Sequence, residues 1–62
     1  MFIHFYDYYS QTVPIFTVNY ECFGVKPSVG EYVFISKELY KVINIIIDYN
    51  KNVINVSVEK EL

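Results

Sequence analysis

The clearest pattern of apolar and polar positions lies near the end of the chain. Ile54, Val56 and Val58 alternate with polar residues across residues 53–59. This period of two is typical of a strand with one buried face and one wet face. Residues 39–49 are apolar at both odd and even positions. They predict a strand that is central, or one that bends at a β-bulge and serves two half-sheets.

Turn signals divide the chain into five predicted strands. A loop containing Gly24, Pro27 and Gly30 precedes the third strand, Lys37-Glu38 forms a tight turn, and residues 50–52 form another. The predicted strands are residues 2–9, 12–22, 32–36, 39–49 and 53–59.

The composition supports this assignment. Valine, isoleucine, tyrosine and phenylalanine dominate, alanine is missing, and leucine occurs only at Leu39 and Leu62. β-Branched and aromatic side chains suit a pleated surface, whereas the best helix formers are nearly absent. We therefore expect one all-β domain over residues 1–62, a small five-stranded SH3-like barrel or a strongly bent antiparallel sheet.

A short hairpin around Ser10-Gln11 would set the register of the first two strands. Ile3 would then face Val18 and Phe5 would face Phe16. These four side chains form a purely apolar face, so we predict that they belong to the core.

The other face of this hairpin mixes aromatic rings with hydroxyl groups and an imidazole. Such side chains have an apolar body and a polar tip and are common at protein interfaces. In the alternative, Tyr6 and Tyr8 cap the end of the barrel. In the predicted hairpin register, Tyr6 lies opposite Ile15 and Tyr8 lies opposite Val13 on this second face. The predicted partner-binding residues are His4, Tyr6, Tyr8, Val13, Ile15 and Thr17.

Charge argues against nucleic acid as the partner. The net charge is −2, and the chain contains no arginine. Nucleic-acid binding depends on basic side chains that meet phosphates. The alternatives that stay open are a binder of single-stranded nucleic acid or nucleotides by aromatic stacking, and a self-assembling structural protein.

Chemistry-bearing residues are few. Cys22 is the only cysteine, so no internal disulfide forms, and we interpret it as a structural thiol in a reducing cytoplasm. His4 lies on the opposite face from Cys22, and the acids are scattered near turns. We expect no catalytic residue, no metal site and no cofactor. No apolar run is longer than four residues, so we also expect no membrane span and no signal peptide.

Residues 27–58 carry the segments PSVGEYVFI, YKV and VINVSV. This order resembles small phage and prophage proteins of low-GC Gram-positive bacteria, whose pattern is P-x-V-G-[DE]-x-V-x-I, a short polar turn, Y-x-V and a last alternating strand. The resemblance implies a compact β-fold and a phage-type genetic setting, and it implies no reaction.

These observations together predict a binding protein rather than an enzyme. More than half of the side chains are apolar, 53%, and so small a domain leaves part of them exposed. We expect a homodimer or higher oligomer that engages a host protein and inhibits a bacterial defence system.

Overall fold

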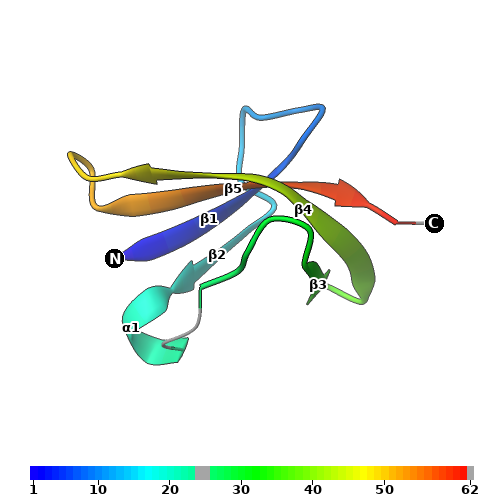
Figure 1. Cartoon of the computed structure of the whole chain (residues 1–62), viewed down its shortest axis with the longest axis horizontal. Coiled ribbons are helices and arrows are strands. Elements are labelled where there is room, and N and C mark those ends of the chain that lie inside the picture. The colour runs from blue at the N-terminus through cyan, green and yellow to red at the C-terminus, as the bar shows by residue number, and fades with distance from the viewer. Residues whose placement is uncertain (24–25, 62) are drawn as a thin grey trace.

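A computed structural model describes residues 1–23 and 26–61 and contains one mixed five-stranded sheet with the strand order β2-β1-β5-β4-β3 (Figure 1). A single helical turn, α1, follows β2. The elements are β1 (Phe2–Asp7), β2 (Phe16–Asn19), α1 (Tyr20–Phe23), β3 (Tyr32–Ile35), β4 (Glu38–Asp48) and β5 (Val53–Lys60). The predicted all-β, five-stranded class is confirmed.

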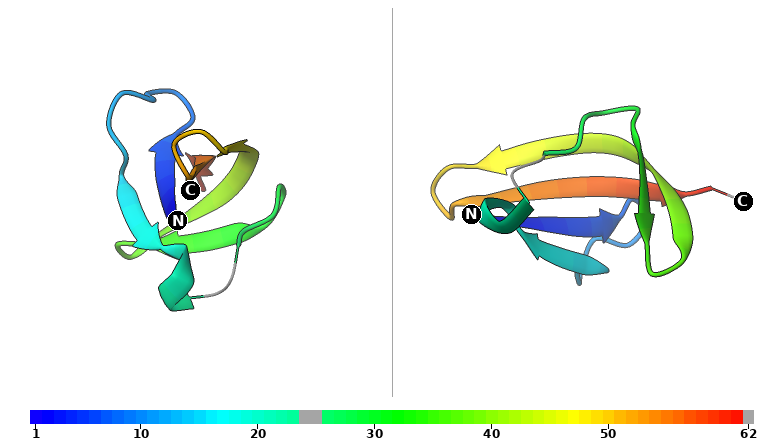
Figure 2. Two further views of the ribbon diagram at one scale, coloured as in Figure 1. Left: turned by 90° about the vertical axis from the view of Figure 1, so that its left-hand side faces the viewer. Right: turned by 90° about the horizontal axis from the view of Figure 1, so that it is seen from below.

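The sheet curls into a half-barrel, so β2 and β3 remain as two separate edges (Figure 2). The pairs β1–β2, β3–β4 and β4–β5 are antiparallel, but β1 runs parallel to β5. The sheet is therefore mixed rather than antiparallel throughout. The central strand β5 and its neighbour β1 carry most of the core.

A β-bulge bends the longest strand, which was one of the two alternatives predicted from the double apolar pattern of residues 39–49. Val42 pairs with Val58 and Asn44 pairs with Ser57, so Ile43 is the extra residue. The insertion shifts the side-chain alternation by one position. As a result, Val42 before the bulge and Ile45 after it share the inner face.

The inner face of β5 is the best-buried part of the chain. Ile54, Val56 and Val58 are almost fully buried, as their alternation predicted. Ile3 and Phe5 from β1 pack beside them. The complete buried apolar set is Ile3, Phe5, Ile35, Val42, Ile54, Val56 and Val58.

Tight turns join the strands of both C-terminal hairpins. Ser36 and Lys37 have positive φ angles of 50° and 68°, which is the geometry of a two-residue type I′ turn. This turn lies one residue before the predicted position. Asn52, with φ 58°, closes the turn between β4 and β5, as expected for an asparagine.

The prediction for the first hairpin was right in register and wrong in extent. Ile3 does pair with Val18 and Phe5 with Phe16, but β1 ends at Asp7. There the Asp7 side chain accepts a hydrogen bond from the backbone N–H of Tyr9, at 2.9 Å. This turn starts an eight-residue connection, residues 8–15, in place of the predicted two-residue loop.

The second strand is also shorter than predicted. It ends at Asn19, whose side-chain oxygen accepts a hydrogen bond from the backbone N–H of Glu21, at 3.0 Å. An asparagine in this role starts a helical turn, which explains why α1 replaces the expected end of the strand. Among the described residues, no helix is long and apolar enough to cross a membrane.

Two isoleucines provide a matched test of the core. Ile54 is 2% exposed, whereas Ile46 is 60% exposed. Ile54→Ala should cost about 2–5 kcal/mol of unfolding free energy, because it leaves a cavity between the central strands. The total free energy of unfolding of a chain of this length is only about 3–9 kcal/mol. Ile46→Ala should cost less than about 1 kcal/mol by urea denaturation. Equal losses in the two variants would contradict the assigned core.

Candidate functional site

A row of three rings lies along the outer face of β1. Phe2, His4 and Tyr6 alternate with the buried residues of the strand, and adjacent ring centroids in the row are 6.4 Å apart. The His4 imidazole Nδ1 lies 3.0 Å from the hydroxyl oxygen of Thr17, its partner on β2. This contact fixes the ring beside β2. The row combines ring surface with hydrogen-bonding groups at His4 and Tyr6, which the sequence predicted on this face, and adds Phe2, which was not among the predicted residues.

The structure divides the six predicted partner-binding residues into two groups. His4, Tyr6 and Thr17 lie on the strands, where His4 and Tyr6 are half-buried and Thr17 is exposed. The other three, Tyr8, Val13 and Ile15, are exposed and lie in the connection 8–15.

The predicted ladder pairs Tyr6–Ile15 and Tyr8–Val13 are wrong. The Ile15 backbone N–H instead donates to the carbonyl oxygen of Phe5, at 2.7 Å. Pro14 has no N–H to donate to a ladder, and β2 begins only at Phe16.

The connection 8–15 is attached to the outer face of β5. The Gln11 side-chain amide donates to the Ser57 hydroxyl at 3.1 Å and to the Tyr8 carbonyl oxygen at 3.2 Å. These bonds place Gln11 over Ser57, which is buried although it lies on the outer face. Ser57 pairs with Tyr6 across the parallel ladder, so the anchored connection lies beside the ring row.

Tyr9 joins the same connection to the end of β5. Its hydroxyl donates a hydrogen bond to the Glu59 carboxylate, and its ring meets Tyr8 edge-on at a centroid distance of 5.2 Å. This hydrogen bond and the nearby negative charge of Glu59 raise the pKa of Tyr9. Both effects favour the protonated phenol over the phenolate.

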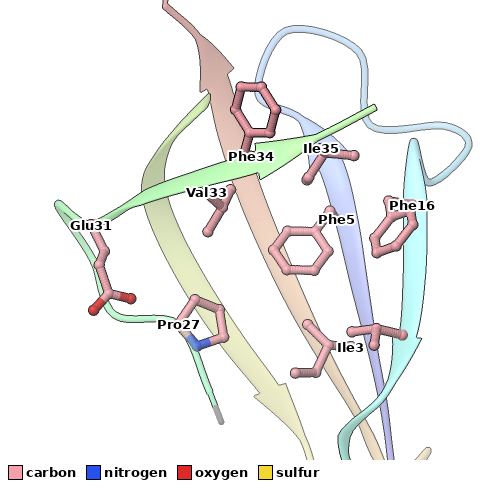
Figure 3. Close-up of a pocket in the computed structure, with 9 residues that line it drawn as sticks. Ile3, Phe5, Phe16, Pro27, Glu31, Val33, Phe34 and Ile35 are labelled. Atoms are coloured by element: carbon pink, nitrogen blue, oxygen red, sulfur yellow. The ribbon is translucent and has the colours of Figure 1, made fainter. Parts of the chain in front are cut away.

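The inner face of the half-barrel contains a groove that the sequence did not reveal. It has a volume of about 250 Å³ and lies between β2 and β3, over β1. Val33 and Phe5 point into it, whereas Phe34 projects from the opposite side of β3 and reaches only its rim (Figure 3). The lining residues are Ile3, Phe5, Phe16, Val18, Pro27, Glu31, Val33, Phe34 and Ile35.

The groove corrects one core prediction. Phe16 packs on Phe5 with a ring-centroid distance of 6.2 Å, but it is 44% exposed rather than buried. The open sheet explains this exposure, because no strand lies beyond β2 to cover the ring. Glu31, the only charged residue of the lining, accepts a hydrogen bond from the backbone N–H of Ser28 at 3.0 Å. The groove therefore offers apolar contact and little polar chemistry.

Within residues 1–23 and 26–61, no cluster of histidine, cysteine, aspartate and glutamate side chains could hold a metal ion. The side chain of Cys22 lies outside the described residues, so its predicted structural role stays a prediction. Comparisons of the chain with protein-family models, curated proteins and solved structures found no match. The resemblance of residues 27–58 to phage proteins also stays a prediction.

The contact between Tyr9 and Glu59 predicts a particular order of titration. Because its pKa is raised, Tyr9 should ionise late among the seven tyrosines in a spectrophotometric titration. Tyr9→Phe should remove one tyrosine ionisation from the high-pH end of the titration curve. Glu59→Gln should shift the ionisation of Tyr9 to lower pH. The hydrogen bond stabilises the fold while the phenol is protonated and is lost as pH rises through the pKa of Tyr9. A titration curve that is the same with and without Glu59 would contradict the contact.

Proposed function

We propose that this chain is a small non-catalytic protein-binding module whose contact surface is the outer face of β1 and β2 with the connection 8–15. We call this surface the ring face. Its residues are Phe2, His4, Tyr6, Tyr8, Val13, Ile15 and Thr17. The observation that carries the proposal is the row formed by Phe2, His4 and Tyr6, which lies on the side of the sheet away from the core.

The chemistry of the ring face supports a protein as the ligand. Aromatic side chains with polar tips supply large contact areas and directional hydrogen bonds, and they are enriched in interface hot spots. The face continues into exposed apolar side chains of the connection, among them Val13 and Ile15. Exposed apolar surface is typical of interaction sites.

We further propose that the partner is a host protein and that binding inhibits a bacterial defence system. Support for this step comes from the resemblance of residues 27–58 to phage proteins, and from size, because an inhibitor need only cover a site. The net charge of −2 favours a partner with a basic surface.

The test uses tagged protein and lysate of a low-GC Gram-positive host. Wild type should retain a defined protein that the double variant Tyr6→Ser/Tyr8→Ser does not retain. Tyr49→Ser is the matched control, because Tyr49 is an exposed tyrosine in the turn that precedes Val53, whereas Tyr6 pairs with Ser57 farther along β5. With the purified partner, the double variant should bind at least about 30-fold more weakly, as expected for hot-spot residues.

A second variant separates a lost contact from a lost fold. Thr17 is exposed on β2, so Thr17→Lys should keep the circular dichroism spectrum of wild type and lower the thermal midpoint only slightly, through the lost contact with His4. It should nevertheless weaken binding, because it places a long charged side chain beside His4. Partner binding that survives both Thr17→Lys and the double variant would exclude the ring face as the contact surface.

A further inference from the structure

The groove on the inner face opens directly onto the buried core. Ile3, Phe5 and Ile35 belong to its lining and are each at most 6% exposed, so a molecule in the groove contacts core side chains. Val33 points into the groove from β3 (Figure 3). On the side of β2, the half-exposed ring of Phe16 forms part of the wall. The groove therefore presents apolar surface that the described part of the chain leaves open.

The size of the groove suits a small organic molecule. Its volume of about 250 Å³ is below the roughly 300–1,000 Å³ of pockets that hold drug-sized ligands. A benzene ring with a two-carbon chain and one polar end group, about nine non-hydrogen atoms, is of the right order. The rings of Phe5 and Phe16 are tilted by 45° to one another, so a third ring can meet one of them edge to face.

One carboxylate gives this apolar groove a polar end. Glu31 is the only charged residue among the described lining residues. Its N–H donates to the Ser28 carbonyl oxygen at 3.1 Å, and its own carbonyl oxygen accepts from the Val42 N–H at 2.8 Å. The backbone of Glu31 is therefore held on both sides.

The side chain of Glu31 is oriented as well. Its Oε1 accepts the N–H of Ser28 at 3.0 Å. This bond orients the carboxylate but leaves its negative charge in place, because the amide donor is neutral. An ionised carboxylate accepts up to about four hydrogen bonds, so it retains capacity for a ligand. A cationic end group complements it, whereas an anionic end group is repelled.

We propose that the groove binds an aralkyl ammonium ion, a small molecule that joins an aromatic ring to a protonated amine. The ring packs on Phe5 and Val33, and the ammonium group lies against the Glu31 carboxylate. Because Glu31 is exposed, the charge strengthens binding only about threefold over a neutral ligand of the same shape. The site is independent of the proposed function, since the ring row lies on the other side of the sheet.

NMR titration of the amide signals of the full chain with three matched probes tests the site. The probes are 2-phenylethylammonium, 2-phenylethanol and 3-phenylpropanoate, which share a phenyl ring and a two-carbon chain and differ in the charge of the end group. The ammonium should shift the signals of Phe16, Val33 and Ile35, with a dissociation constant of about 1 mM. It should bind about threefold more tightly than the alcohol, and the carboxylate should bind more weakly than the alcohol.

Two outcomes of these titrations would overturn the proposal. The first is that no probe gives saturable shifts in the groove, including shifts that are confined to the ring face. The second is that the ammonium and the alcohol bind with equal affinity, which would remove the role of the charge.

Matched substitutions of two exposed acids isolate the effect of the charge. Glu31→Gln keeps an oxygen that can accept the Ser28 N–H but removes the charge, so the ammonium and the alcohol should bind equally. Glu38→Gln is the control, because Glu38 pairs with Lys60 and lies outside the lining. It should keep the preference of wild type for the ammonium. A preference that survives Glu31→Gln would exclude Glu31 as the recognising group.

Filling the groove provides the second arm. Val33→Phe places a larger side chain where Val33 points inward, so all three probes should bind at least about tenfold more weakly. Tyr6→Ser/Tyr8→Ser, which changes the ring face, should bind the ammonium as wild type does. A Val33→Phe protein that is folded and binds as tightly as wild type would exclude the groove. The comparison of Glu31→Gln with Glu38→Gln decides the proposal if Val33→Phe does not fold.

Discussion

The half-barrel depends on one extra residue in its longest strand. Ile43 is accommodated as a bulge, so Val42 and Ile45 both face the core although three positions separate them. β4 pairs with β5 over residues 40–48 and with β3 over residues 38–41, and the bulge lies just beyond the part that carries β3. Ile35, at the end of β3, is thereby brought into the buried cluster with Phe5. Without the bend, β3 would extend the sheet outward, and its inner face would lie in solvent.

Because the curled sheet does not close into a barrel, apolar surface remains accessible at its two edge strands. β2 and β3 do not meet, so the groove between them stays accessible and each strand keeps an unpaired edge. The total accessible surface is 4416 Å², close to the roughly 4200 Å² expected for a compact monomer of this mass. The chain is therefore compact, and its unusual feature is the apolar character of its surface. Exposed apolar side chains occur both on the ring face, at Phe2 and Ile15, and on β3, at Phe34.

Local signals in the sequence predicted much of the fold. The alternation at Ile54, Val56 and Val58 identified the best-buried strand, and the double apolar pattern of residues 39–49 indicated the bulge. The register of Ile3 with Val18 was also correct. The parallel pairing of β1 with β5 could not be predicted, because it joins distant segments with no turn between them. Side-chain hydrogen bonds at Asp7 and Asn19 ended strands that the apolar pattern alone would continue. The exposure of Phe16 follows from the open sheet, which no local pattern reveals.

The most direct test of this account is deletion of Ile43, followed by urea denaturation. Removing the bulge residue leaves every cross-strand pair of β4 with β5 available in a regular ladder. The account predicts that the straighter strand moves β3 away from Phe5 and exposes Ile35, at a cost of about 2–3 kcal/mol. Deletion of Thr12, which is exposed in the connection 8–15, is the control and should cost much less. A variant without Ile43 that is as stable as wild type would contradict the claim that the bulge shapes this fold.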